Sequence, residues 1–325
     1  MEKISFEKII SIENLLGAWE EFLRGKRDRK DVQNFQLHCM DNIISLHHDL
    51  KNQTYVHGGY EMFTISDPKQ RTIHKASVRD RLLHHAIYRV LYQYFDTKFI
   101  HDSYSCRNNK GTHKAIERFH SFARKVSKNW TKQCWVLKCD VRKFFASIDQ
   151  DILIIILEKN IEDRNIIWLL RKVIQSFSST QRGKGLPLGN LTSQLLVNVY
   201  MNEFDHCVKQ VMKIPYYIRY ADDFVILSQD KYELEIVLNH ITLFLHEVLG
   251  LTLHPNKVSI QTYSSGIDFL GWVNFPRHRV LRTVTKRRML KKLFQCTPSQ
   301  ESAQSYLGML GHGNSFKIRS KIIIK

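Results

Sequence analysis

The chain has 325 residues, of which 43% are hydrophobic and 25% are charged, so its composition is that of a globular protein with a large core. Its 49 Lys and Arg residues outnumber its 31 Asp and Glu residues, which gives a formal net charge of +18. This surplus favours a polyanionic partner, above all nucleic acid. A merely basic soluble protein, or one that touches anionic membranes, would show the same excess.

The cysteines and the hydropathy pattern exclude several other classes of protein. The six cysteines form no CxxC pair and no Cys/His ligand spacing, which is typical of reduced, buried thiols. The N-terminus lacks the apolar core of a signal peptide, and the longest aliphatic run, residues 152–157, is far too short to span a bilayer. We therefore expect a soluble cytoplasmic protein with no membrane partner.

The N-terminal third is predicted to be mainly helical. Apolar residues at helical spacing indicate helices within residues 5–53. Residues 60–76 predict two short strands around the turn Asp67-Pro68, and residues 77–95 an amphipathic helix. Another helix is expected over residues 110–126, after a loop rich in Asn, Lys and Gly.

Strands and helices interleave in the middle of the chain. The segment "CWVLKCDVRKFF" predicts a buried strand that ends at Asp140. A helical stretch over residues 150–177, a loop and a helix over residues 191–212 follow. The next pattern, "YYIRYADDFVILS" at residues 216–228, predicts a β-hairpin with a tight turn.

The C-terminal part changes composition. Residues 231–249 predict one more helix, and "FLGWVNF" at residues 269–275 predicts a strand. From Pro276, the stretch "PRHRVLRTVTKRRMLKK" holds eight Lys or Arg residues and no acidic residue. This stretch indicates a helical C-terminal subdomain with a basic face, so the pattern as a whole is α+β.

The pair Asp222 and Asp223 raises the main functional question. Two adjacent carboxylates repel each other, and the apolar strands around them add a desolvation cost. Taken alone, Ala-Asp-Asp is typical of an exposed hairpin turn, in which Asp is common. Together with Asp140, the pair could instead hold the divalent metals of a phosphoryl-transfer site, because bound metal turns repelling carboxylates into ligands.

The order of the neighbouring blocks favours the second interpretation. In this order the sequence resembles bacterial-type reverse transcriptases, from about residue 60 to residue 275. "YIRYADDFVIL" is similar to their catalytic hairpin, and "LKCDVRKFFASID" to the strand with the other metal-binding aspartate. The further blocks that resemble the family are "VRDRLLHHAIYRVL", "SYSCRNNKGTHKA", "GLPLGNLTSQLLVNVYMNEFD", "LTLHPNKVSI" and "FLGW".

The resemblance implies roles for individual residues. Asp140 and Asp222 are expected to bind two Mg²⁺ ions, for which Mn²⁺ is a possible substitute, and Asp223 is expected to assist. Lys257 is expected to protonate the leaving pyrophosphate, although a surface lysine is the simpler alternative. Phe145 stands where the family has the steric gate against a ribose 2′-OH; a core aromatic residue is the alternative.

Further residues are expected to bind the substrates. Contacts with the incoming nucleotide are implied for Lys69, Arg71, Leu188, Gly189 and Gln194, besides Phe145. Contacts with nucleic acid are implied for Arg107, Lys110, Gly271, Trp272, Arg282, Lys286, Arg287 and Arg288. A solvated charged face is the alternative explanation of the basic segment 277–292.

One departure from the common pattern bears on the biological role. Many reverse transcriptases have Pro-Gln-Gly and later Ser-Pro where this chain has Pro187-Leu188-Gly189 and Ser193-Gln194. This variant resembles the error-prone reverse transcriptases of diversity-generating retroelements. An antiphage defence reverse transcriptase that acts on a dedicated noncoding RNA is the alternative, and a catalytically silent RNA-binding relative is a third.

The resemblance thus predicts a right-hand polymerase with fingers, a palm built on an antiparallel sheet, and a helical thumb. Residues 1–59 would form an N-terminal helical extension, residues 60–275 the fingers and palm, and residues 276–325 the basic thumb. The expected partners are an RNA template, a DNA or RNA primer, dNTPs, a noncoding RNA and an accessory protein.

Overall fold

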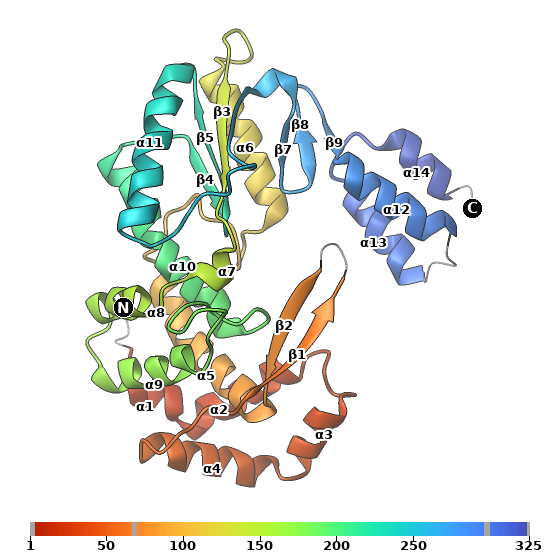
Figure 1. Cartoon of the computed structure of the whole chain (residues 1–325). Coiled ribbons are helices and arrows are strands. Elements are labelled where there is room, and N and C mark those ends of the chain that lie inside the picture. The colour runs from red at the N-terminus through yellow and green to blue at the C-terminus, as the bar shows by residue number, and fades with distance from the viewer. Residues whose placement is uncertain (1–3, 67–69, 296–299, 324–325) are drawn as a thin grey trace. The chain divides into compact units, whose positions relative to one another are not determined.

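The computed structural model divides the chain into two compact units, each made of three segments (Figure 1). Unit 1 contains residues 1–100, 142–207 and 244–252, and unit 2 contains residues 101–141, 208–243 and 253–325. The structure describes residues 4–66, 70–295 and 300–323. The predicted division at residues 59 and 275 stays a prediction.

Unit 1 is built mainly of helices, with one β-hairpin. Its elements are α1 (Phe6–Ile10), α2 (Ile12–Leu23), α3 (Lys30–Leu37), α4 (Cys39–Lys51), β1 (Tyr60–Ile65), β2 (Arg71–Ala76), α5 (Val78–Asp96), α7 (Phe144–Ser147), α8 (Gln150–Asn160), α9 (Arg164–Gln175) and α10 (Leu191–His206). The stretch 150–177 was predicted without a break. It divides in the structure because Asp163 caps α9, its side chain accepting hydrogen bonds from the backbone N–H groups of Asn165 and Ile166.

Helix α5 lies at the centre of unit 1, where it packs against α1, α2, α3 and α10. Its N-terminus is capped by Ser77, whose hydroxyl accepts a hydrogen bond from the backbone N–H of Asp80. Leu82, Leu83 and Leu91 on this helix are completely buried. Burial of such side chains, at about 25 cal/mol per Å² of apolar surface, is the main stabilising contribution to this core.

The hairpin β1–β2 is antiparallel, with Tyr60 opposite Ala76 and Ile65 opposite Arg71. The predicted turn Asp67-Pro68 lies outside the described residues. Both strands are largely exposed up to the base of the hairpin, where Ala76 is buried. The hairpin is therefore held to the rest of unit 1 through its base and through the second half of β2, residues 73–76.

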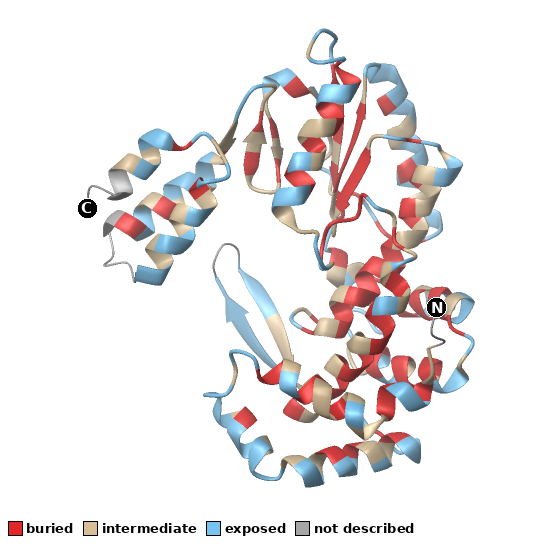
Figure 2. Ribbon diagram, turned by 180° about the vertical axis from the view of Figure 1, so that it is seen from behind, coloured by how far each residue is buried: buried red, intermediate tan, exposed pale blue. Residues whose placement is uncertain are grey.

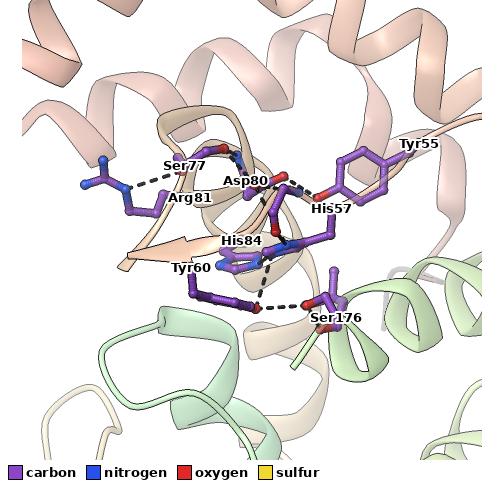
Figure 3. A network of polar contacts seen from close by, with 10 residues as sticks. Tyr55, His57, Tyr60, Ser77, Asp80, Arg81, His84 and Ser176 are labelled. Atoms are coloured by element: carbon purple, nitrogen blue, oxygen red, sulfur yellow. Dashed lines mark hydrogen bonds and ion pairs between the residues drawn. The ribbon is translucent and has the colours of Figure 1, made fainter. Parts of the chain in front are cut away.

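A buried carboxylate organises this base (Figure 3). Asp80, which is 1% exposed, accepts hydrogen bonds from the Tyr55 hydroxyl at 2.7 Å, the Ser77 hydroxyl at 2.6 Å and the Gly58 backbone N–H at 3.1 Å. Burial, followed by the nearby Asp80 charge, raises the pKa of Tyr55, so this phenol stays protonated and donates. Three donors compensate the cost of burying the Asp80 carboxylate.

Two histidines continue the same network (Figure 3). The Nε2 atoms of His57 and His84 lie 3.3 Å apart, and the His57 ring stacks on Tyr60 at 5.0 Å between centroids. The Tyr60 hydroxyl also lies 2.9 Å from the Ser176 hydroxyl, which follows α9. Polar side chains thus connect the first residue of β1 to α5 and to the end of α9.

Unit 2 contains two antiparallel sheets and the C-terminal helices. Its elements are α6 (Thr112–Val126), β3 (Trp135–Asp140), β4 (Tyr217–Tyr220), β5 (Asp223–Ser228), β6 (Ser259–Thr262), a 3₁₀ turn (Tyr263–Ser265), β7 (Ile267–Phe269), β8 (Trp272–Asn274), β9 (Arg279–Leu281), α12 (Thr283–Gln295), α13 (Gln300–Leu310) and α14 (Phe316–Ile323). Helix α11 (Lys231–Glu247) begins in unit 2 and ends in unit 1, and a π-helical turn (Cys207–Val211) follows α10 at the other boundary.

The larger sheet has the strand order β4-β5-β3-β6, and all of its neighbouring strands are antiparallel. Figure 2 shows its central strands buried over most of their length. Helix α6 covers one face, where Phe119 and Phe122 pack in one cluster with Val136, Ile218 and Val225. This cluster confirms the predicted strand that ends at Asp140 and the predicted hairpin at residues 216–228.

The prediction of a single strand over residues 269–275 was wrong. Residues 267–274 form a hairpin, β7–β8, in which Phe269 pairs with Trp272 across the two-residue loop Leu270-Gly271. Both loop residues have positive φ, +52° and +88°, as a tight type I′ turn requires. Strand β9 was also missed, because its sequence lies within the basic stretch that was predicted to be helical.

The C-terminal helices pack on this second sheet. Trp272, Met289 and Leu310 are buried in one cluster together with Ile116 of α6. Within the part of the chain that the structure describes, no helix has the length and hydropathy needed to span a membrane. The mixture of helices with two antiparallel sheets confirms the predicted α+β class.

Candidate active site

Three carboxylates meet at one end of the larger sheet in unit 2. Asp140 is the last residue of β3 and Asp223 the first residue of β5, and the register places them directly opposite each other. Residues opposite each other in an antiparallel pair point to the same face of the sheet. Asp222 lies in the turn directly before Asp223, and its carbonyl oxygen accepts a hydrogen bond from the Val141 N–H at 3.1 Å. The end of β3 is thereby bonded to the tip of the hairpin.

Lys257 contacts the first of these carboxylates. Its Nζ lies 2.7 Å and 2.8 Å from the two carboxylate oxygens of Asp140. The backbone supports this geometry, because the His254 N–H donates to the Asp140 carbonyl oxygen at 2.8 Å and the Lys257 N–H donates to the His254 carbonyl oxygen at 3.0 Å. The Asp140 side chain is only 10% exposed, so the ammonium group compensates much of its buried charge.

The electrostatics of the site are concentrated on Asp223. Burial, the largest cause, raises the pKa of Asp223 to about 6, and the negative charges of Asp222 and Asp140 act in the same direction. Lys138 and Lys257 oppose this increase in pKa. Lys138 lies two residues before Asp140 on β3, so its side chain emerges on the same face. Three carboxylates and two ammonium groups therefore share one end of the sheet.

The sequence interpretation did not single out Arg219, which supports the turn. This arginine is completely buried in β4, where its Nη1 donates to the Ala221 carbonyl oxygen at 3.2 Å and its Nη2 donates to the Ser103 hydroxyl at 3.1 Å. Ala221 has a φ of +54°, which is uncommon for a residue with a Cβ. The guanidinium group thus stabilises the turn immediately before Asp222. The sequence signal that could have indicated this role is a charged residue within an otherwise apolar and aromatic strand.

The carboxylates do not form a complete metal cage by themselves. Among the described residues, no group of three or more His, Cys, Asp or Glu side chains is arranged to hold a metal ion. Mg²⁺ sites usually need only one or two protein carboxylates, since water and substrate phosphates supply the other ligands. Oxygen donors on one face of a sheet fit a site of that kind, and the pKa of Asp223 is raised there by burial and, to a smaller extent, by the neighbouring carboxylates.

The residues expected to bind the nucleotide lie in unit 1, except Lys69, which is outside the described residues. Arg71 begins β2 and is exposed, and Gln194 lies in the first turn of α10. Phe145 is half-buried in α7, and its carbonyl oxygen accepts a hydrogen bond from the Leu186 N–H at 2.8 Å. The loop that contains Leu186 is thereby fixed beside α7.

The same loop is also bonded to the hairpin β1–β2. The Leu188 carbonyl oxygen accepts a hydrogen bond from the His74 N–H of β2 at 3.0 Å. The next residue, Gly189, has a φ of +104°, and a Cβ added to it would lie 2.8 Å from a side-chain carbon of Ile73. Only glycine allows both this backbone conformation and this close approach. The structure therefore brings Leu188 and Gly189 together with β2.

The first two residues expected to contact nucleic acid already make internal contacts. Arg107 donates to the Ser103 carbonyl oxygen at 3.1 Å, and Lys110 donates to the His101 carbonyl oxygen at 2.8 Å. Both side chains are half-buried. These hydrogen bonds tie both side chains to the backbone of their own loop, which precedes α6.

The remaining candidates lie in the hairpin β7–β8, at Arg282 between β9 and α12, and on α12 itself. Gly271 occupies the turn of the hairpin, and the Trp272 ring is buried at 3% exposure, so Trp272 has little side-chain surface for a ligand. Arg282 pairs with Asp268 at 2.6 Å. On α12, Lys286 and Arg287 are exposed and Arg288 is half-buried.

Comparisons with known proteins agree with this geometry. Residues 65–273 match the family model described as reverse transcriptase (RNA-dependent DNA polymerase). The chain is 24% identical, over 68% of its length, to an uncharacterized 91 kDa protein in the cob intron of Schizosaccharomyces pombe, and 20% identical, over 71%, to the group II intron-encoded protein LtrA of Lactococcus lactis subsp. cremoris. A telomerase structure from Candida albicans superposes on 72% of the chain with a TM-score of 0.54 at 14% identity.

The fold is that of a right-hand polymerase, with the carboxylates at the end of a four-stranded antiparallel sheet. Because the family model covers well over half of the residues, the chain belongs to the reverse transcriptase family. The chain spans 34% of the fission yeast protein, 49% of LtrA and 46% of the telomerase chain.

Proposed function

We propose that the protein is an RNA-directed DNA polymerase, which extends a DNA or RNA primer on an RNA template with dNTPs. The observation that carries this proposal is the pairing of Asp140 with Asp223 across β3 and β5, with Asp222 in the adjoining turn. All three carboxylates, and Lys257 beside them, lie within the region that matches the family.

Two divalent cations, Mg²⁺ or Mn²⁺ as a substitute, fit this donor set. Asp140 and Asp222 would hold them, with Asp223 as an additional ligand. When bound, such cations neutralise charge on the attacking and leaving oxygens of a phosphoryl transfer. The pKa of Asp223 is raised to about 6, first by burial and then by the charges of Asp222 and Asp140. This supports the proposal, because a bound cation would offset both the burial cost and the repulsion.

The chain's own residues position the substrates and supply a proton. The Lys257 ammonium group donates a hydrogen bond to Asp140. In the proposed reaction this ammonium group would give a proton to the leaving pyrophosphate. Arg71, with Lys69, would bind the triphosphate, since a guanidinium group pairs with two phosphate oxygens at once. Phe145 would exclude a ribose 2′-OH by its bulk, so that dNTPs are preferred over NTPs.

Helix α12 would hold the template-primer duplex. Lys286 and Arg287 are exposed on this helix, which has no acidic residue. Contacts with the phosphate backbone carry no base information, so this grip is independent of sequence and weakens with salt. A noncoding RNA as the template and an accessory protein are the further partners that we propose.

Primer extension on an RNA template with Mg²⁺ and dNTPs tests the activity. We expect extension by the unmodified protein and its loss in Asp222→Asn. Asp230→Asn is the matched control, because Asp230 is an exposed residue that follows the same hairpin and accepts a hydrogen bond that Asn can also accept. Absence of extension on every template, including the protein's own noncoding RNA, would contradict the proposed activity. Activity in Asp222→Asn would contradict the assignment of the site.

For the biological role we propose an error-prone enzyme of a diversity-generating retroelement. The two relatives named above are intron proteins, so this finer assignment rests on the sequence pattern, chiefly residues 187–194. Leu188 has no side-chain group that could hydrogen-bond near a nascent base pair, which would weaken base discrimination. Sequencing of products made by Leu188→Gln tests this role, and an unchanged misincorporation spectrum would refute the part assigned to Leu188.

An antiphage defence enzyme is the second candidate, and the neighbourhood of the gene separates the two. A template repeat with a matching variable repeat supports the retroelement. A gene for a structured RNA without such repeats supports defence.

A further inference from the structure

Unit 2 contains a polar pocket of about 550 Å³, here called the junction pocket. Its walls come from the exposed side of α6, from the turn between β8 and β9, and from the turn between α13 and α14. The first turn and its flanks contribute residues 274, 275 and 277–279, and the second contributes residues 311–314. Asp140, Asp222 and Lys257 are not among its described lining residues, so the pocket is distinct from the candidate active site.

The charge of the junction pocket favours an anion. Arg277 and Arg279 line it, and Glu117 is the one acidic residue among the described lining residues. Neither guanidinium group lies within ion-pair distance of a carboxylate in the described parts of the chain, whereas the neighbouring Arg282 pairs with Asp268 at 2.6 Å. Arg279 already donates its Nε–H to the His312 carbonyl oxygen, which leaves its two Nη groups for a phosphate. The exposed Arg277 keeps its guanidinium donors for the same kind of contact.

Flat rings lie beside these cations. The His278 ring stacks on Phe275 with 4.6 Å between centroids and 13° between planes. The His312 ring stacks on His113 with 3.5 Å between centroids and 20° between planes. Both His278 and His312 are exposed, so each pair presents one ring to solvent, and that ring is packed on a second ring. Such exposed rings are the surfaces on which unpaired bases stack.

The walls of the pocket are bonded to one another. The Asn314 N–H donates to the Arg279 carbonyl oxygen at 2.9 Å, which connects the two turns. His120 Nε2 lies 3.1 Å from the Pro276 carbonyl oxygen, which accepts its proton and connects α6 to the first turn. Gly313 lies so close to a buried tryptophan ring that an added Cβ would be 2.1 Å from it. Because these contacts fix the walls, a ligand loses little free energy in ordering them.

We propose that the junction pocket binds an unpaired nucleic-acid strand, with Arg277 and Arg279 on its phosphates and the His278 ring against a base. The inference goes beyond the proposed polymerase activity, because it assigns a single strand to residues outside the active site. It also separates the pocket from α12, for which we proposed contacts with the duplex. RNA and DNA share the phosphate and base chemistry, and the experiment distinguishes them.

The test measures binding without catalysis. The 325-residue Asp222→Asn protein, without divalent metal or dNTPs, is titrated into fluorescein-labelled RNA and DNA strands of about 12 nucleotides and into their duplex, at several salt concentrations. The variants are Arg277→Gln and His278→Ala, both at exposed positions. Lys125→Gln is the matched control, because Lys125 is an exposed cation of α6 outside the pocket lining.

We expect Arg277→Gln to weaken single-strand binding about tenfold and to reduce the salt slope by about 0.7, as loss of one phosphate contact requires. We expect His278→Ala to weaken it about fivefold without changing the slope, since it removes stacking and no charge. We expect Lys125→Gln to bind the single strands with nearly the affinity of the parent protein. If the variants bind RNA, DNA or both single strands more weakly, the proposal is supported, and the affected strand shows which nucleic acid the pocket binds.

Unchanged binding of both strands by both variants, or an equal loss for the duplex, overturns the proposal. The test is separate from the proposed polymerase function, because binding needs no extension. Failure of primer extension together with the expected binding losses would refute the polymerase proposal and leave the pocket assignment standing.

Discussion

Acidification is expected to destabilise unit 1 through His84. This histidine is buried in α5 at 1% exposure, and burial, followed by the nearby His57 charge, lowers its pKa to about 3. Asp80 acts in the opposite direction, whereas His85 and Arg81 add to the decrease. An unfolded chain binds this proton with a pKa near 6.5, so the unfolded state takes up more protons as the pH falls.

The magnitude follows from proton linkage. Between the unfolded pKa of about 6.5 and the folded pKa of about 3, the free energy of unfolding decreases by about 1.4 kcal/mol per pH unit for this one group. At pH 5 the loss attributable to His84 is therefore about 2 kcal/mol. Above pH 6.5 the group is neutral in both states and the loss disappears.

The hydrogen bonds indicate which substitution isolates the effect. His57 Nδ1 lies 2.5 Å from the Gly58 carbonyl oxygen, so it carries the proton and His57 Nε2 accepts. His84 Nε2 is then the donor across the 3.3 Å contact between the two rings. In His84→Gln, an amide N–H can donate in its place without titrating. His38→Gln is the matched control, since His38 is exposed in the same unit.

Urea unfolding of the three proteins at about pH 7.5 and about pH 5 measures the effect. We expect the stability of His84→Gln to fall by about 2 kcal/mol less than that of the parent between the two pH values, while His38→Gln follows the parent. If His84→Gln retains the full pH dependence of the parent, the linkage argument is refuted.

Three further outcomes are expected. Gly189→Ala should cost about 1–3 kcal/mol in urea unfolding, because of its positive φ and the close side chain, whereas Gly59→Ala, which meets open space, serves as its control and should cost much less. Arg219→Met should cost about 1–3 kcal/mol and reduce kcat of primer extension, because it leaves buried acceptors without their donor; an unchanged kcat would contradict its role in positioning the turn. Iodoacetamide should modify the exposed Cys106 in the native protein but Cys139 only after unfolding, since burial raises the pKa of the Cys139 thiol, and mass spectrometry of the digest reads this out.

Local patterns predicted the elements whose periodicity is undisturbed. The hairpin around Asp222 was predicted because apolar strands flank a short polar turn, and α5 because its apolar residues repeat at helical spacing. The hairpin at Leu270-Gly271 was missed because a leucine with positive φ is rare, so an apolar run around one glycine is typical of a single strand. Tertiary contacts, not local preference, maintain that backbone conformation.

The site was predicted less completely than the fold. The order of blocks indicated which aspartates belong together, but their pairing across β3 and β5 depends on a register between distant segments. The ion pair of Lys257 with Asp140 and the hydrogen bond of Arg219 to Ala221 also join positions for which no local rule exists. The histidines around Asp80 lie in separate segments and left no pattern in the sequence.

The interleaving of the two units constrains how the chain folds during synthesis. The last residue of unit 1 is Thr252, whereas unit 2 continues to the end of the described chain. On the ribosome, β3 must wait until β5 and then β6 have been made before its two edges are paired. An unpaired, apolar β3 is prone to aggregate during this interval. Slow elongation before residue 228 would therefore lower the yield of soluble protein, and coexpressed chaperones would restore it.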